Sequence, residues 1–263
     1  MSRSWRESAR VVLSPQRVDL MRRRGWLSRG QDAKESRAVA VAASGEPWLG
    51  SIEELERVLQ GAQWTSARLN VVLSSQFVRF QLVPWQADLR HTDERLAYAR
   101  YLFKEVYGAM SEGWEIRLSE EPPGAHSLAC AIDHALLEAL RRAAAAGGCR
   151  LRSVQPRFVE AFNHLRRGLR GDSVIFAFSE PGRLCAGHLR KRTWRALRNE
   201  AEPGRAGAAL PAVLGQLALA EEEPIGNPNV YWADAEGATA VSDLQLRCAS
   251  MDGLLSGRLA WDA

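Results

Sequence analysis

The sequence predicts an α/β protein in which one order of elements, three strands, a helix and a further strand, occurs twice. Short apolar runs at residues 10–13 and 174–178 each start such a series. In both series turn residues lead to two more strands, and apolar residues at helical spacing then precede another strand. We therefore expect two halves, residues 1–168 and 169–263, each with a mixed sheet flanked by helices.

The first half opens with a predicted hairpin of strands 10–13 and 17–23, and a third strand is expected at 37–42. The next element is a helix that ends at Gly61. Ser51 to Glu54 has the sequence of a capping box, which predicts that this helix begins there.

The stretch from Leu69 to Gly108 carries the clearest local signals. Strands are predicted at 69–73 and 77–83, joined by a tight turn and ended by Pro84. Thr92 is a candidate N-cap for a helix that Gly108 closes. We expect this helix to pack on the two strands before it.

The first half continues with strands at 114–118 and 127–132. Asp133 is expected to cap an alanine-rich helix, and a strand at 151–154 and a short helix ending at Gly168 follow. The same order of elements then begins again.

The second half is expected to contain three consecutive antiparallel strands at 174–178, 183–189 and 193–198. Pro211 stands near the start of the next predicted helix, and the strand 229–233 follows.

The composition is that of a globular protein. Hydrophobic residues make up 46% of the chain, enough for a sizeable core. No apolar run approaches the roughly 18 residues that cross a bilayer, and Met1 to Arg10 lacks the apolar centre of a signal peptide. We therefore expect a cytoplasmic protein. Its four cysteines are scattered, which indicates reduced and mostly buried thiols.

The formal net charge is +4, and basic residues gather in residues 1–30 and 190–198. Such clusters can bind acidic lipid, nucleic acid or an acidic surface of another protein. They are explained equally well as the solvent-facing side of an outer sheet. The sequence has neither a recognition helix nor a motif of stacking aromatic residues. We therefore expect no nucleic-acid partner.

The duplicated order of elements is the one that the actin-like, or ribonuclease H-like, fold implies. Three stretches carry a closer similarity to a known family. They are the run from Val71 to Arg79 followed by Pro84 and Trp85, the later run from Ser153 to Pro156, and the series of three strands that begins at Val174. Together they resemble the type IV pilus assembly protein PilM and the cytoplasmic part of the type II secretion protein GspL.

This resemblance implies a non-catalytic scaffold or docking protein of an inner-membrane assembly platform. It would be cytoplasmic and would reach the membrane indirectly, by binding a short cytoplasmic segment of a bitopic inner-membrane assembly protein. Self-association is left open. The alternative is an ATP-binding, actin-like ATPase of the same machinery with divergent phosphate loops.

The two hairpins that would hold a nucleotide argue against the alternative. Nucleotide-binding actin-like folds place an aspartate beside a glycine in each hairpin, around phosphates and magnesium. Residues 12–16 and 176–182 have no such pair in place, and Pro15 lacks the N–H that a phosphate would need. The chain also has no Walker-type Gly-x-x-x-x-Gly-Lys. We expect no cofactor; ATP with magnesium belongs only to the alternative.

Other catalytic or metal-binding interpretations find no support. Cys185 and His188 are three apart on a predicted strand, which sends their side chains to opposite faces. None of the five histidines has zinc-site spacing. Asp19, Asp133 and Asp172 are explained by a strand, a helix cap and a turn. No catalytic or metal-binding residue is therefore predicted.

Three aromatic residues are the candidate anchors for a partner segment: Trp85, Tyr98 and Tyr101. An extended peptide gains main-chain hydrogen bonds along a strand edge, and aromatic side chains beside it supply specificity. The competing interpretation, that all three cap the core, is equally consistent with the sequence.

Overall fold

The computed structural model of the chain describes residues 8–23, 33–40, 45–221, 224–235 and 244–250. The strands form two five-stranded sheets and one three-stranded sheet. The contacts divide the chain into two compact units. One consists of Met1–Val78 with Ile132–Arg157, and the other of Arg79–Ala131 with Phe158–Ala263.

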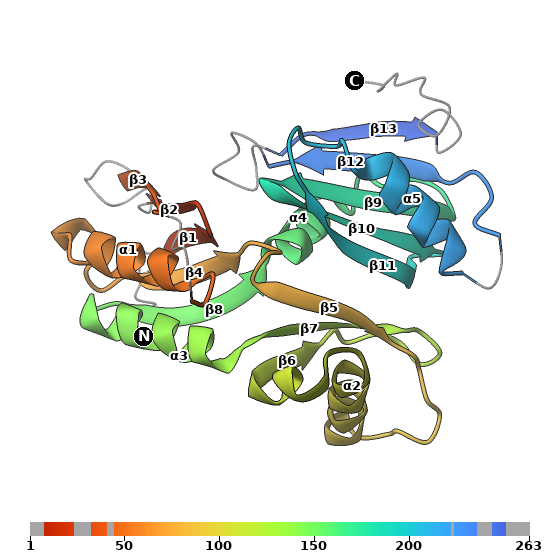
Figure 1. Cartoon of the computed structure of the whole chain (residues 1–263), viewed down its shortest axis with the longest axis horizontal. Coiled ribbons are helices and arrows are strands. Elements are labelled where there is room, and N and C mark those ends of the chain that lie inside the picture. The colour runs from red at the N-terminus through yellow and green to blue at the C-terminus, as the bar shows by residue number, and fades with distance from the viewer. Residues whose placement is uncertain (1–7, 24–32, 41–44, 222–223, 236–243, 251–263) are drawn as a thin grey trace, which may run out of the picture. The chain divides into compact units, whose positions relative to one another are not determined.

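The first unit is built on a five-stranded sheet with the strand order β3-β2-β1-β4-β8 (Figure 1). Its first three strands are antiparallel, and β1, β4 and β8 are parallel. Leu13 and Val71 are fully buried at the centre of this sheet, as expected for apolar strands covered by helices. The strands are β1 (Ser8–Ser14), β2 (Arg17–Arg23), β3 (Ala33–Ala38), β4 (Arg68–Leu73) and β8 (Arg150–Pro156). The third strand therefore lies four residues earlier than the predicted 37–42.

Two helices of this unit lie side by side (Figure 1): α1 (Leu49–Leu59) and α3 (His134–Ala146), with the short 3-10 helix η1 (Ala62–Trp64) after α1. Asp133 caps α3 as predicted, because its carboxylate accepts a hydrogen bond of 2.8 Å from the backbone N–H of Ala135. A Cβ atom at Gly147 would lie 2.7 Å from Cβ of Leu59. A glycine at this position therefore allows the end of α3 to approach α1.

The predicted start of α1 is wrong. The helix begins at Leu49 after the N-cap residue Trp48, not at the Ser51 capping box. Ser51 is fully buried within the first turns, and its hydroxyl donates a hydrogen bond of 2.8 Å to the backbone carbonyl of Ser14. A serine that resembles a cap in the sequence thus ties the helix to the β1–β2 turn.

The five-stranded sheet of the second unit repeats the arrangement, with the order β11-β10-β9-β12-β13. Its first three strands are antiparallel and β12 is parallel to β9, but β13 is antiparallel to β12, unlike β8 in the first sheet. The strands are β9 (Ser173–Glu180), β10 (Gly182–Arg190), β11 (Thr193–Glu202), β12 (Asn229–Asp234) and β13 (Leu246–Ser250). The predicted duplicated α/β architecture with two mixed sheets is confirmed; β13 was not predicted.

Side chains of the second sheet alternate between two cores. Ile175 and Ala177 pack with helix α5 (Leu210–Leu219), which lies across one face of the sheet (Figure 1). Phe176 and Phe178 point the opposite way and pack with Phe158 of helix α4 (Arg157–Leu165). This alternation is the period of two expected for a strand buried on both sides.

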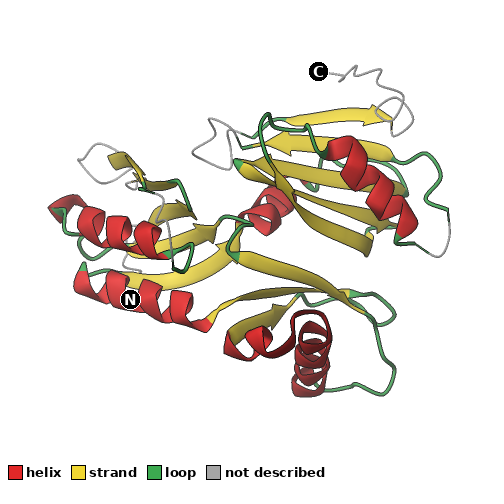
Figure 2. Cartoon of the chain, in the orientation of Figure 1, coloured by secondary structure: helices red, strands yellow, loops and turns green. Residues whose placement is uncertain are grey.

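Residues between β4 and α3 form a separate layer with a three-stranded sheet and one long helix (Figure 2). Its elements are β5 (Val78–Val83), α2 (Thr92–Tyr107), the 3-10 helix η2 (Gly108–Gly113), β6 (Trp114–Leu118) and β7 (Ser127–Asp133), in the sheet order β5-β7-β6. The predicted pairing of the strands at 69–73 and 77–83 is therefore wrong, because β4 joins the first five-stranded sheet and β5 joins this one.

Helix α2 packs on the three-stranded sheet through Ala99 and Phe103, which contact Val83, Ile116 and Ala129. The predicted N-cap is displaced by one residue. The helix begins at Thr92, His91 is the capping residue, and the His91 backbone N–H donates to the Glu94 carboxylate at 3.0 Å. Gly108 ends the helix with a positive φ of 62°, as expected.

The compact units differ from the predicted halves, residues 1–168 and 169–263. The halves describe the duplicated order of elements, whereas the contacts group the inserted layer of residues 79–131 and helix α4 with the second sheet. The division into halves at residue 168 stays a prediction.

Candidate functional site

The predicted anchor residues lie in the inserted layer. Trp85 follows β5 and is 43% exposed, and Tyr101 on α2 is 56% exposed. Core residues are far less exposed than this, and an exposed aromatic ring can contact another molecule. The structure therefore contradicts the core interpretation for these two residues, and their role as anchors stays a prediction.

Tyr98 combines both roles. It packs against the core beneath α2, and its ring stacks on that of Tyr101 with the centroids 6.4 Å apart and an angle of 12° between the rings. The ring of Tyr98 thereby offers the exposed ring of Tyr101 one packing partner. Within the described residues, no ring contact joins Trp85 to either tyrosine.

The strand that precedes Trp85 lies at the edge of its sheet. In the part of the chain that the structure describes, β5 ends the three-stranded sheet and pairs only with β7. An outer strand presents N–H and C=O groups that an extended peptide can use. Trp85, two residues beyond the end of β5, would then lie near such a peptide.

The first candidate nucleotide hairpin is a tight turn held by its own side chains. Ser14 and Arg17 form the last pair of the β1–β2 ladder, with Pro15 and Gln16 at the turn. The Ser14 hydroxyl donates to the Arg17 carbonyl at 3.0 Å, and Ser51 bonds the Ser14 carbonyl. The turn thus uses its polar groups internally.

The second hairpin is closed by Pro181 and by Gly182 at φ 81°. Glu180 beside it is only 2% exposed, so its carboxylate is not presented to solvent. The hydroxyl of Ser179 hydrogen-bonds the buried Glu202 carboxylate, which also accepts from the backbone N–H of Ala209 at 3.3 Å. These bonds stabilise the sheet itself; the absence of a nucleotide site stays a prediction.

His188 and Cys185 point to opposite faces of the second sheet, as predicted. Cys185 packs in the core on the α4 side, where complete burial raises the pKa of its thiol well above the ordinary value. The His188 ring is fully buried, with Nε2 2.8 Å from the Ser173 hydroxyl and Nδ1 hydrogen-bonded to the Glu221 carboxylate. The three polar groups satisfy one another inside the fold.

The other residues considered in the sequence are the basic stretch at the start of the chain and the aspartates Asp19 and Asp172. In the arginine-rich stretch of residues 1–30, residues 8–23 are described and form β1, β2 and the turn between them; the rest of the stretch lies outside the described residues. Asp19 accepts a hydrogen bond of 2.7 Å from Arg17, and the Asp172 carbonyl accepts one of 2.6 Å from Lys191. Among the described residues, no group of three acidic, histidine or cysteine side chains could hold a metal ion.

Neither a protein-family model nor a curated protein matches the chain, whereas solved structures do. The cytoplasmic domain of EpsL, an inner-membrane component of the type II secretion system of Vibrio cholerae, aligns with a TM-score of 0.51 and 15% identity, over 79% of this chain and 74% of that one. A Bacteroides thetaiotaomicron protein with an actin-like ATPase fold and unknown function aligns with a TM-score of 0.54 and 10% identity, over 81% and 76%.

The PilM-PilN type IV pilus biogenesis complex aligns with a TM-score of 0.52 and 14% identity, over 82% of this chain and 68% of that one. The predicted resemblance to PilM and GspL-type cytoplasmic domains is thus confirmed for the fold. Identities of this size show architecture alone. The chain has the duplicated actin-like fold.

Proposed function

We propose that the chain is a non-catalytic docking scaffold of a type IV pilus or type II secretion inner-membrane platform. It works in the bacterial cytoplasm and binds a short cytoplasmic segment of a bitopic membrane protein. The single observation that carries the proposal is the exposure of two aromatic side chains, Trp85 and Tyr101, on the layer inserted into an actin-like fold.

The chemistry of this surface supports peptide binding. An extended segment would pair with the outer edge of β5 and place apolar side chains against Trp85 or Tyr101. Aromatic side chains give large contact area at little cost in conformational entropy. Tyr101 is restrained further by its stacking on Tyr98. The described helices are all too short or too polar to cross a bilayer.

The likeness to the EpsL domain and to the PilM-PilN complex supports the choice of machinery. The first is described as part of an inner-membrane component, and the second is a complex of PilM with a further protein. A partner anchored in the membrane is accordingly proposed here.

Site-specific photo-crosslinking in the chain's own cells tests the proposal. A photo-reactive amino acid at Tyr101 or Trp85 is expected to crosslink one bitopic membrane protein through residues on the cytoplasmic side of its span. Leu219, 88% exposed on α5, provides a control position of similar character. The proposal is wrong if Tyr101 yields the same products as Leu219, or yields only soluble proteins.

A further inference from the structure

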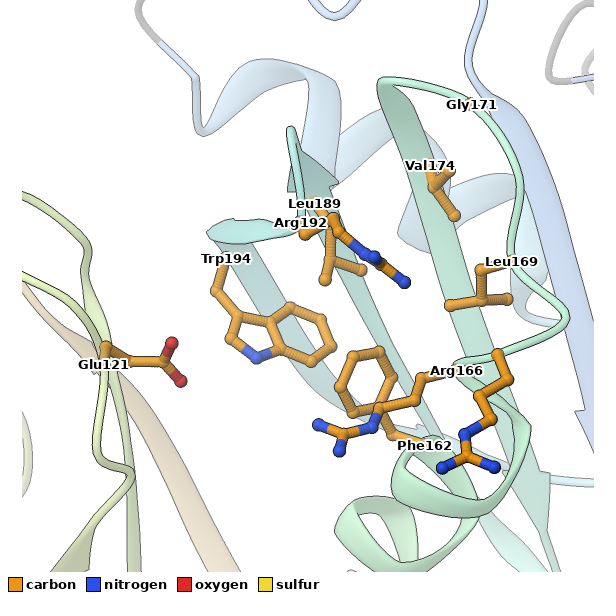
Figure 3. Close-up of a pocket in the computed structure, with 10 residues that line it drawn as sticks. Glu121, Phe162, Arg166, Leu169, Gly171, Val174, Leu189, Arg192 and Trp194 are labelled. Carbon is orange, nitrogen blue, oxygen red and sulfur yellow. The ribbon is translucent and has the colours of Figure 1, made fainter.

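A second site lies in the second unit, where the end of α4 meets the β10–β11 turn (Figure 3). It is a pocket of ≈ 390 Å³. Its apolar wall includes Phe162 and Trp194, whose ring centroids are 4.6 Å apart, and Leu189. A volume of this order is at the lower end of the range of small-molecule pockets, about 300–1,000 Å³.

Three arginines line the same pocket: Arg166, Arg167 and Arg192. Figure 3 shows Arg166 and Arg192 reaching toward the space over the aromatic rings from two different elements. Among the described residues, no carboxylate forms an ion pair with any of the three guanidinium groups. The acidic residue of the lining, Glu121, accepts a hydrogen bond of 3.0 Å from the hydroxyl of Ser119. The lining therefore carries an excess of positive charge.

The β10–β11 turn holds its basic residues in an unfavourable conformation. Lys191 and Arg192 have φ angles of 50° and 67°, so both central residues of this two-residue turn have positive φ. Asparagine and glycine are favoured at such positions, because side chains with a bulky Cβ substituent are strained there. Strain of this kind is retained where the side chain has another use. A binding role for Arg192 would explain why an arginine stands at this position.

We propose that this pocket binds an acidic segment of a partner protein in which an apolar side chain stands next to a carboxylate. Arg166 and Arg192 would hold the carboxylate through charge-assisted, bidentate hydrogen bonds, for which guanidinium geometry is suited. The apolar side chain would lie against Phe162 and Trp194. The site shares no residue with the Trp85 and Tyr101 surface and does not depend on the proposed function.

The lining distinguishes this ligand from other anions. Inorganic phosphate would engage the guanidinium groups alone and leave the aromatic wall without a partner. A lipid head group would leave the aromatic wall without a partner, since its acyl chains stay in the membrane. A carboxylate with an adjacent apolar side chain would contact both the guanidinium groups and the aromatic wall of the pocket.

Fluorescence anisotropy tests the site with a labelled pool of short peptides in which aspartate or glutamate alternates with leucine, phenylalanine or tryptophan. The wild-type chain is expected to bind the pool saturably. Arg192→Gly removes one guanidinium and also relieves the backbone strain, so affinity should fall roughly tenfold while the melting temperature stays equal or rises. Arg166→Glu should abolish binding.

Arg205→Glu is the matched control, because Arg205 is exposed outside the pocket. It should leave binding unchanged, and a pool with amides in place of the carboxylates should not bind. The proposal is overturned if the acidic pool does not bind, or if Arg205→Glu weakens binding as much as Arg166→Glu. It is overturned as well if inorganic phosphate or phosphatidylglycerol vesicles bind at Arg166 more tightly than the pool.

Discussion

Gly187 of β10 lies directly beneath the indole ring of Trp194 of β11. A Cβ atom on Gly187 would be 2.4 Å from Cζ3 and 2.9 Å from Cε3 of that ring, closer than non-bonded carbon atoms approach. Trp194 is only 5% exposed and packs against Phe158 and Phe162. The glycine thus sets the position of the indole, and with it one wall of the arginine-lined pocket.

Gly187→Ala is expected to lower the free energy of unfolding by about 1–3 kcal/mol, because the indole has no free space into which to move. Gly215→Ala in α5 is the control. No atom lies within 4 Å of its added Cβ, so the helix should gain about 0.5–1 kcal/mol. Urea unfolding measures both; equal stability of the two variants would contradict the packing argument.

Replacing the strained turn by asparagine and glycine should stabilise the fold. Lys191→Asn with Arg192→Gly suits the positive φ of both positions and is expected to add about 1 kcal/mol, since strain at each non-glycine residue costs of order 1–3 kcal/mol. Calorimetry should show a rise of about 2–4 °C in the melting temperature. An unchanged or lower value would mean that the turn carries no strain.

The partly buried thiol of Cys130 should make the fold less stable in alkali. Loss of solvent around it raises its pKa from the ordinary 9.0 to about 12. Between these two values the unfolded chain releases the thiol proton and the folded chain keeps it, so the free energy of unfolding falls as the pH rises. Cys130→Ala should reduce this slope in denaturant titrations at several pH values. An identical slope in both proteins would show that the Cys130 thiol does not cause the loss of stability in alkali.

Mg-ATP should not stabilise the chain. The two hairpins close on themselves through Ser14 and through the Pro181–Gly182 turn, and Glu180 is buried. A ligand at one hundred times its dissociation constant adds about 2.7 kcal/mol, which a thermal-shift titration detects easily. A flat titration is expected. A dose-dependent rise in melting temperature would favour the ATP-binding alternative.

Local chemistry made most elements predictable from the sequence. Asp133 signals the start of α3, Gly108 the end of α2, and the apolar runs around Val71 and Phe176 the central strands of two sheets. Which strands pair with one another was harder to predict from the sequence. The tight spacing of β4 and β5 suggests a hairpin, but the choice of partner depends on contacts with β1 and β7, far away in the sequence.

Two further features depend on tertiary context. The sequence around Ser51 is that of an N-cap. Its hydroxyl nevertheless donates its hydrogen bond to the backbone carbonyl of Ser14, 37 residues earlier. The arginine-lined pocket was missed because Arg166 and Arg192 come from separate elements, and neither segment forms a motif. The available signal was the basic cluster at 190–198, which contains Arg192 but not Arg166. For Trp85 and Tyr101, the sequence left open whether the side chains cap the core, and the structure shows both exposed.

Sedimentation with membrane vesicles tests the docking role most directly. Inner-membrane vesicles from the chain's own organism, with the cytoplasmic face outward, should bind the wild-type protein. Protease treatment of that face beforehand should abolish binding, and Trp85→Ala should weaken it by about 2 kcal/mol without loss of folding, as for an exposed aromatic anchor. Equal binding to protein-free liposomes of anionic lipid would contradict the account, because basic patches would then suffice.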